Sequence, residues 1–181
     1  MATLQIRKVQ APAESLLFSS KDKYHYIDSF QGYLSDVENK IGARDMAKAF
    51  FSSGPSWIGQ LFSLRNRIVK SFGLKTSEDG IQNNLDNQKW EAGEQIGLFR
   101  LFQVNDREVI MGEDDKHLDF RISLLAEPVE GNQKRLTITT TVVFRNFFGR
   151  LYFLPVKPFH SLIVPVMLKG MLRDLDYGKH S

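Results

Sequence analysis

Residues 117–145, HLDFRISLLAEPVEGNQKRLTITTTVVFR, contain the pattern that decides the fold. Polar and apolar residues alternate over 117–127 and again over 135–145, and Val, Ile, Thr and Phe are frequent there. Because successive side chains of a strand point to opposite faces, this period of two predicts two long strands joined by a loop at 128–134. One face would carry Leu118, Phe120, Ile122 and Leu124.

The same period of two recurs in three other segments, at 24–34, 95–104 and 107–113. An Asn-Asp pair at 105–106 predicts a tight turn between the last two, and a charged turn is expected at 114–116. The chain therefore predicts one early strand and, later, four consecutive antiparallel strands.

Two short helices are predicted between the first strand and the others. One covers 44–52, and the next covers 55–72 with Pro55 in the tolerated first turn. The apolar residues of the second recur at three- and four-residue steps and so form one buried face. They are Trp57, Ile58, Leu61, Leu64, Ile68, Val69 and Phe72.

A long helix is expected in the final unit, 147–176, where residues 158–175 read PFHSLIVPVMLKGMLRDL. This stretch is apolar on nearly all sides, so it must be covered on more than one face. Pro155, Pro158 and Pro165 should interrupt the first part of the unit, and Pro165 should kink the helix.

These elements predict an α+β fold. A curved antiparallel sheet wraps around the long C-terminal helix, and two short helices follow the first strand. A chain of 181 residues suits a single domain over 1–181, with 1–20 as a loose lead-in. The space between helix and sheet is where a cavity for a small apolar ligand is expected.

Composition narrows the class of protein. Hydrophobic residues make up 42% and charged residues 25%, as in globular domains, and cysteine is absent. A disulfide framework and a cysteine nucleophile are therefore excluded, and a cytoplasmic location is expected. No apolar signal region and no run of roughly 18 apolar residues occurs, so no membrane-spanning helix is expected. The net charge of +3 is spread along the chain, which argues against a nucleic-acid partner.

Two segments, GEDDKHLDFRIS (112–123) and VVFRNFFGRLYFLPVKPFHSLIVPVML (142–168), resemble the signature segments of a bacterial family catalogued as domain of unknown function 2867. That family is grouped with the START-like, or SRPBCC, helix-grip superfamily, which includes polyketide cyclases and lipid- or hormone-binding proteins. The likeness extends over roughly residues 20–175 in the order of elements. It implies a fold with a cavity rather than a particular reaction, because the relatives include both enzymes and binders.

Three polar residues, His117, Asp119 and Arg121, alternate along one predicted strand, so their side chains should share a face. With Glu113 or Asp115 from the preceding turn, they could form an acid–base cluster in which His117 or Asp119 is catalytic. Arg121 is also a candidate ligand contact. The alternative is a solvated outer face on which Asp119 and Arg121 are paired across strands.

A second polar group falls between the last strand and the last helix. Asn146 opens it, and Gly149 could supply a backbone conformation that other residues resist. Arg150 could hold a carboxylate or phosphate, while Tyr152 and His160 could hydrogen-bond the polar end of a ligand. Alternatively, these residues tie the junction together, with Arg150 paired to an acidic residue of the chain.

Large apolar residues are the candidates for the cavity wall, and Trp57 and Trp90 are the best single ones, although such aromatics are usually core. The acids at 113–115 point apart and no histidine pair has HxxxH spacing, so no metal is expected. Nucleotide-binding and common hydrolase motifs are absent, and no cofactor is expected. The other wall candidates are Phe99, Leu101, Phe120, Ile122, Met167 and Met171.

Three functions follow from this description. The first is a binding module for a small apolar or amphipathic molecule in the cavity. The second is an enzyme of the cyclase or lyase type, with His117 and Asp119, or His160 alone, as general base on a carbonyl compound. The third is an accessory domain that pairs with another protein or with a second copy of itself.

The apolar stretch 158–175 has one further interpretation, as a surface that binds a membrane or a partner. Lys157, Lys169 and Arg173 would suit anionic lipid. Its apolar residues on two or three sides fit burial inside the fold better, so burial is the interpretation that the sequence favours.

Overall fold

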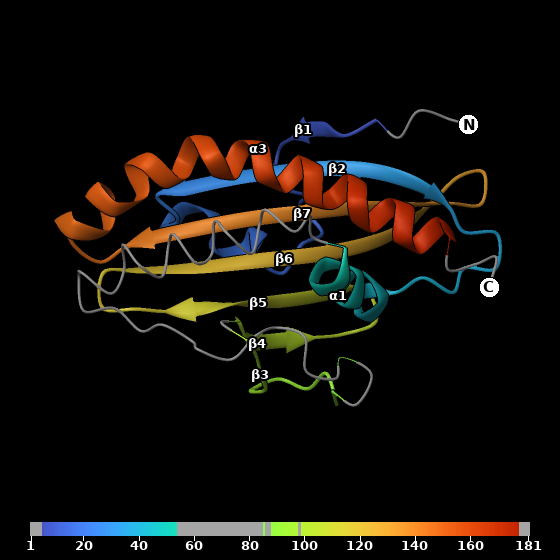
Figure 1. The fold of residues 1–181 in the computed structure, drawn as a ribbon, viewed down its shortest axis with the longest axis horizontal. Helices are drawn as coiled ribbons and strands as arrows, with labels where there is room; N and C mark the ends of the chain where they lie inside the picture. Colours follow the sequence, from blue (N-terminus) through green and yellow to red (C-terminus); the bar gives the residue numbers. More distant parts are fainter. Residues whose placement is uncertain (1–4, 54–84, 86–87, 98, 178–181) are drawn as a thin grey trace.

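The computed structural model describes residues 5–53, 85, 88–97 and 99–177 of the chain. Within these residues, a curved antiparallel sheet of seven strands packs against a long C-terminal helix, an α+β arrangement of the helix-grip kind (Figure 1). The strand order is β1-β2-β7-β6-β5-β4-β3. The predicted fold class is confirmed, while the helix expected at 55–72 lies outside the described residues.

The middle of the sheet is built from the strands that the period of two predicted. β6 (Leu118–Val129) pairs with β7 (Gln133–Phe144) along its whole length, and β7 pairs with β2 (Tyr26–Ser35). β5 (Glu108–Asp114) and β4 (Phe99–Val104) continue the sheet on the other side of β6. The predicted alternation holds, because the helix-facing side of β6 buries Leu118, Ile122 and Leu124.

The connection between β6 and β7 is much shorter than the loop predicted at 128–134. β6 runs through Pro128 to Val129, and β7 begins at Gln133. Gly131 (φ 75°) and Asn132 (φ 56°) make the turn, in the left-handed conformation that these residue types tolerate best. The prediction failed because proline and polar residues at the strand ends break the alternation of polar and apolar residues.

The prediction of one continuous strand over 95–104 is wrong. β3 (Gln95–Ile96) pairs with the start of β4, Gln95 opposite Arg100 and Ile96 opposite Phe99. The chain therefore reverses at Gly97, whose φ is 58°. Because Gly97 stands among apolar residues, alternation alone could not distinguish a straight strand from a tight hairpin.

The segment predicted as a loose lead-in contributes to the sheet and covers its other face. Arg7–Val9 form the edge strand β1 beside β2. The chain then crosses the side of the sheet away from the long helix, where it forms a 3-10 helix at Phe18–Lys23 (Figure 1). Glu108, 2% exposed, accepts hydrogen bonds there from Ser15 Oγ (2.6 Å) and the backbone N–H of Leu16 (2.8 Å).

The short helix α1 (Ala43–Ser52) confirms the helix predicted at 44–52. Its start is capped by Asp45, whose Oδ2 accepts the backbone N–H of Gly42 at 2.9 Å. Met46, Ala47 and Phe50 are buried in the main core. α1 therefore packs against both β5 and β6 of the sheet and the long helix.

The long helix α3 (Phe147–Tyr177) starts eleven residues before the apolar stretch that predicted it, and it is one uninterrupted coil in Figure 1. The prediction that Pro155, Pro158 and Pro165 interrupt it is wrong. Proline removes a donor to the carbonyl four residues earlier. For Pro155 and Pro158 these carbonyls belong to Leu151 and Leu154, which are exposed, so water can satisfy them.

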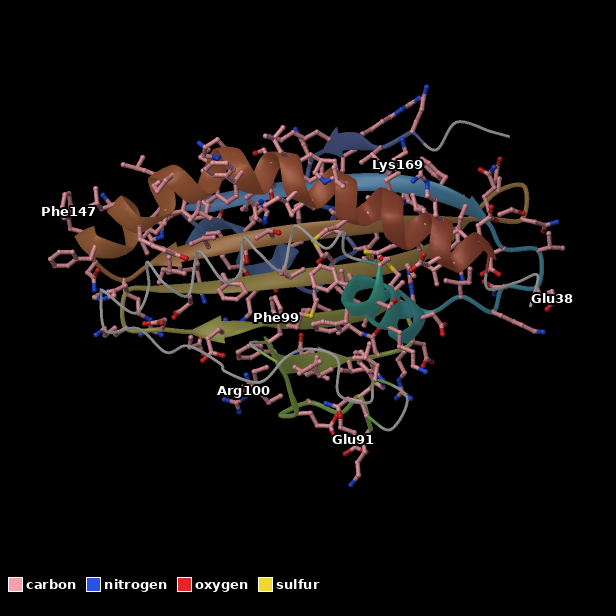
Figure 2. The ribbon with its side chains drawn as sticks, viewed as in Figure 1. Glu38, Glu91, Phe99, Arg100, Phe147 and Lys169 are labelled. Carbon is pink, nitrogen blue, oxygen red and sulfur yellow. The ribbon has the colours of Figure 1, made fainter. Side chains whose placement is uncertain are left out.

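The two halves of α3 differ in burial. The C-terminal half packs into the main core with α1 and the sheet through Leu168, Met171 and Leu172, each fully buried. In the N-terminal half, Phe153 joins a smaller cluster with Leu118 and Val142. The outward side of this half is exposed, and Figure 2 shows Phe147 pointing away from the sheet at the start of the helix.

Candidate functional site

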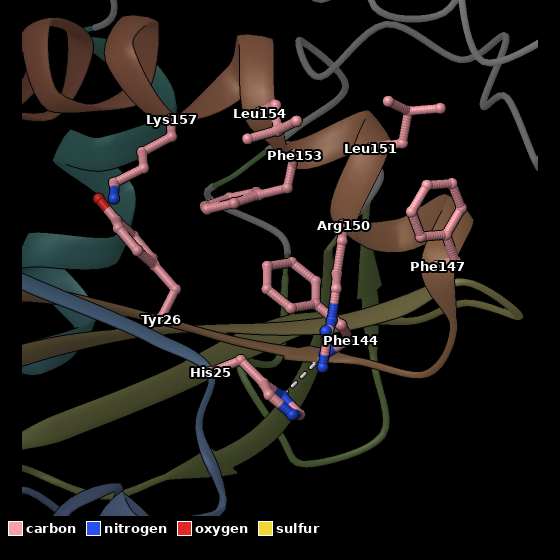
Figure 3. Close-up of a pocket in the computed structure, with 9 residues that line it drawn as sticks. All are labelled: His25, Tyr26, Phe144, Phe147, Arg150, Leu151, Phe153, Leu154 and Lys157. Carbon is pink, nitrogen blue, oxygen red and sulfur yellow. Dashed lines mark hydrogen bonds between the residues drawn. The ribbon is translucent and has the colours of Figure 1, made fainter.

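A pocket of about 290 Å³ opens between the first turns of α3 and the adjoining ends of β2 and β7 (Figure 3). The chain just before β2 and the first residue of that strand form one wall, Phe144 at the end of β7 forms the floor, and α3 supplies the rest. Most of the lining residues are apolar or aromatic, and two of them, Arg150 and Lys157, are cationic. The lining residues are His25, Tyr26, Phe144, Phe147, Arg150, Leu151, Phe153, Leu154 and Lys157.

The two cations, Arg150 and Lys157, are both exposed. Arg150 extends from α3 toward His25 (Figure 3), and its side chain has no hydrogen bond or ion pair with any described residue. Lys157 Nζ lies 5.6 Å from the centre of the Tyr26 ring. The alternative in which Arg150 pairs with an acid of the chain is therefore not seen among the described residues, and both cations are accessible to an anionic group.

The imidazole of His25 adds a hydrogen-bond donor to the pocket. The backbone N–H of Phe144 donates to His25 Nδ1 at 3.1 Å, dashed in Figure 3, and the two rings lie 5.4 Å apart. A nitrogen that accepts this bond carries no proton, so the proton of the neutral ring is on Nε2. That N–H remains to donate to a bound molecule.

Tyr26 and His160 both contact the buried carboxylate of Asp28. The Tyr26 hydroxyl donates to Asp28 Oδ2 at 2.6 Å, and His160 Nδ1 lies 3.3 Å from the same oxygen. The Asp28 side chain is 1% exposed. Burial raises the pKa of the Tyr26 hydroxyl and the bond to Asp28 raises it further, so the phenol keeps its proton near neutrality.

The second oxygen of Asp28, Oδ1, has no hydrogen-bond partner among the described residues, although it is buried. Thr140 lies directly opposite Asp28 in the β2–β7 ladder, and its buried hydroxyl is also without a described partner. Residues opposite each other share one face of a sheet with Cβ atoms about 5 Å apart. Buried polar atoms are normally satisfied, so a small donor such as water or a ligand hydroxyl is the expected complement.

The three residues predicted as an acid–base cluster on one strand do not come together, and His117 lies just before β6. His117 Nδ1 contacts the side chain of Asn146, while Asp119 Oδ1 accepts from Arg145 Nε at 2.8 Å. Arg121 binds Asp114 and stacks 3.6 Å from the centre of the Phe102 ring. No three His, Cys, Asp or Glu side chains converge as a metal site in the part of the chain that the structure describes.

Asn146 and Gly149 hold the start of α3 rather than the pocket. Asn146 Oδ1 accepts the backbone N–H of Gly149 at 3.1 Å, which is an N-cap bond, and its Nδ2 donates to the carbonyl of Lys116 at 3.0 Å. Gly149 is required for space and not for backbone conformation, because an added Cβ would lie 2.1 Å from the carbonyl oxygen of His117.

The remaining predicted residues lie apart from the pocket. Tyr152 is partly buried against the small cluster around Phe153, and Phe120 packs between the two clusters. Trp57 lies outside the described residues. The other predicted wall residues pack with one another in the main core, and they are Trp90, Phe99, Leu101, Ile122, Met167 and Met171.

Of the predicted site residues, Arg150 lines the pocket and His160 lies beside Asp28, whereas the sequence interpretation did not name His25, Tyr26 or Asp28. The signal was present in YHYIDSF at 24–30, where Asp28 shares the face of its strand with Tyr26 and Phe30. A carboxylate on an otherwise apolar face is unusual unless it is paired, and its partner here comes from a helix 132 residues later.

Fold and pocket together define a class of protein, a helix-grip α+β protein with a small, cation-edged pocket at the start of its C-terminal helix. Residues 21–167 match the sequence model of the family described as Protein of unknown function (DUF2867), and the chain belongs to that family. The resemblance drawn from the segments at 112–123 and 142–168 is thereby confirmed at the level of the family. No curated protein matches the chain.

Proposed function

We propose that the protein is a binding module for a small amphipathic molecule with an anionic end. The observation that carries this proposal is the pair of accessible cations, Arg150 and Lys157, at a pocket whose other walls are mainly aromatic and aliphatic. A guanidinium binds carboxylate and phosphate groups through several N–H donors at once, and His25 can add another.

The size of the pocket limits the ligand. Ligand pockets usually enclose roughly 300–1,000 Å³, and this one, at about 290 Å³, is at the small end. Phe144, Phe153 and Leu151 would contact the apolar body of the ligand, while its charged end would stay near the exposed Arg150. A short-chain or aromatic acid fits this description better than a whole phospholipid.

The wider grouping with the START-like superfamily is part of the same proposal. The order of elements supports it, since one long strand is followed by a helix, then antiparallel strands, then a long C-terminal helix. Members of that superfamily are expected to hold ligands between sheet and helix, where this pocket lies.

The proposal is tested with Arg150→Ala and an anionic aromatic probe, 8-anilinonaphthalene-1-sulfonate. Loss of one charge-assisted contact should weaken binding about tenfold. The melting temperature should hardly change, because the arginine side chain has no described ion pair to lose. Arg100→Ala, an exposed arginine outside the pocket, is the matched control and should bind like the wild type. A steep fall in melting temperature for Arg150→Ala would instead assign the arginine a structural role.

A second candidate function is an enzyme of the cyclase or lyase type. The observation in its favour is His160 beside the buried Asp28 and the Tyr26 hydroxyl, an arrangement suited to general acid–base chemistry. Native mass spectrometry of protein purified from its own host separates the two candidates. A molecule that is retained and released unchanged supports the binding module, whereas conversion of that molecule during incubation supports the enzyme.

A further inference from the structure

The first five turns of α3 expose a continuous row of large apolar side chains, which we call the outer stripe. Phe147 and Leu162 are the most exposed, at 71% and 68%. Isolated exposed apolar residues are ordinary, but a contiguous row of this kind marks an interaction surface. The outer stripe consists of Phe147, Phe148, Leu151, Leu154, Phe159, Leu162 and Val166.

The outer stripe follows the helix period and then stops. At 3.6 residues per turn its members all fall on one broad face of the helix, about 30 Å long at 1.5 Å per residue. The next outward positions are Lys169 and Arg173, both exposed. If only the inner face of α3 were buried, its outer face would be polar along its whole length. The outer face becomes polar only after Val166.

α3 is long and apolar enough, by length and composition, to cross a bilayer between Phe147 and Asp176, and it is the one such helix found in the described residues. Burial in the fold covers only 22% of its most apolar window. The helix cannot leave the sheet, however, because Leu168, Met171 and Leu172 are fully buried in the core. The partner of the outer stripe must therefore lie along one side of the helix and cannot surround it.

Charge selects the partner. No acidic residue occurs between Arg145 and Arg173, so the cations beside the outer stripe, Arg150 and Lys157, have no negative counterpart on this stretch. The acid of the adjoining strand β2, Asp28, is buried and already bonded to Tyr26 and His160, and Asp119 of β6 is paired with Arg145. A two-fold dimer would place the same cations on both sides of its interface, whereas an anionic lipid surface complements them.

We infer that the outer stripe of α3 binds the surface of an anionic bilayer, with the helix lying in the plane of the interface. Phe and Leu side chains would enter the boundary between headgroups and acyl chains, and Arg150 and Lys157 would contact lipid phosphates. The pocket opens beside the same helix turns, so it would face the lipid.

The test is co-sedimentation of the full chain with phosphatidylcholine vesicles that contain or lack phosphatidylglycerol. Wild-type protein should bind the anionic vesicles and, at raised salt, release them in part. The double variant F159S/L162S should bind more than about tenfold more weakly, since each side chain loses apolar burial. Neither residue lines the pocket, so binding of the sulfonate probe should persist and separate this inference from the proposed function.

Val37→Ser is the matched control, because Val37 is 70% exposed and lies just after the end of β2, away from the outer stripe. It should sediment with anionic vesicles like the wild type, and circular dichroism should give both variants the wild-type melting profile. No binding of wild-type protein to anionic vesicles overturns the inference. So does a dimer in light scattering that F159S/L162S converts to a monomer, which would assign the outer stripe to a second copy of the chain.

Discussion

One buried ion pair, Asp36 with Lys134, fixes the junction between β2 and α1. Lys134 Nζ lies 3.3 Å from Asp36 Oδ2 and donates to the carbonyl of Ile41 at 2.7 Å. The backbone N–H groups of Ile41 and Lys40 donate to the carboxylate at 3.0 and 3.2 Å. Burial alone would raise the pKa of Asp36, but these donors and the ammonium outweigh it and lower the pKa below its usual value.

The lowered pKa predicts how stability depends on pH. Asp36→Asn should reduce the free energy of unfolding at pH 7 by about 3 kcal/mol, because Lys134 is left buried without its counter-charge. A folded pKa below the unfolded one gives stability that is present above about pH 4 and is lost as the pH falls through the folded pKa. The gap between variant and wild type should therefore narrow in acid.

Urea denaturation at neutral and acid pH measures this gap. Asp22→Asn, at an exposed aspartate in the N-terminal segment, is the control and should match the wild type at both pH values within about 0.5 kcal/mol. Equal stability of Asp36→Asn and wild type at neutral pH would show that the ion pair contributes nothing.

At the scale of the element, Gly149 decides how closely α3 can approach β6. Alanine in a helix interior is normally more stable than glycine by roughly 0.5–1 kcal/mol. Here the added Cβ would meet backbone, the carbonyl of His117, which cannot rotate away. Gly149→Ala should therefore destabilise the protein by about 1–3 kcal/mol, as overpacking does. A thermal melt decides the sign, and an unchanged or higher melting temperature would contradict the close contact.

The elements that period and propensity define could be predicted, because those signals are local. β6, β7 and α1 follow directly from them, and so does the buried C-terminal half of α3. The hairpin at Gly97 and the uninterrupted passage of α3 through Pro155 could not, since they depend on exposure and on turn conformation. Neither is visible in a pattern of apolar residues.

The site was harder to predict than the fold because its residues come from distant parts of the chain. Arg150 and His160 stood out as polar residues at the junction of strand and helix. Asp28 acquires its meaning only when α3 lies across β2 and brings His160 to within 3.3 Å. His117 was predicted on a strand beside carboxylates, but it lies just before β6 and its side chain contacts Asn146.

At the scale of the whole molecule, α3 covers one face of the sheet and the N-terminal segment covers the other. The attachment of the N-terminal segment depends on the carboxylate of Glu108. The Glu108 carboxylate accepts hydrogen bonds from the hydroxyls of Ser15 and Ser123 and from the backbone N–H of Leu16. These bonds hold the N-terminal segment against β5. Glu108→Ala should release this segment while the α3 side of the sheet stays intact. Separate parts of a protein can open locally with different free energies, so one cover can be released while the other stays folded.

Hydrogen–deuterium exchange with mass spectrometry measures that release. Amides of residues 12–23 should exchange faster in Glu108→Ala, and peptides from α3 should keep wild-type protection. Glu127→Ala is the control, a buried glutamate on the same face that pairs with Arg135, and it should leave residues 12–23 protected. Equal exchange of residues 12–23 in Glu108→Ala and wild type would show that the segment is held by other contacts.

The short strands at the two edges of the sheet bear on how this protein behaves when concentrated. β1 has three residues and β3 has two, so neither offers a row of free backbone groups long enough to seed a growing fibre. Crowding should therefore drive the folded chains together through their side chains, in contacts that detergent reverses. β1 pairs only with residues 29–31 of β2, and its loss would leave the whole ten-residue edge of β2 without a partner strand, a length that can template the pairing of further chains into amyloid.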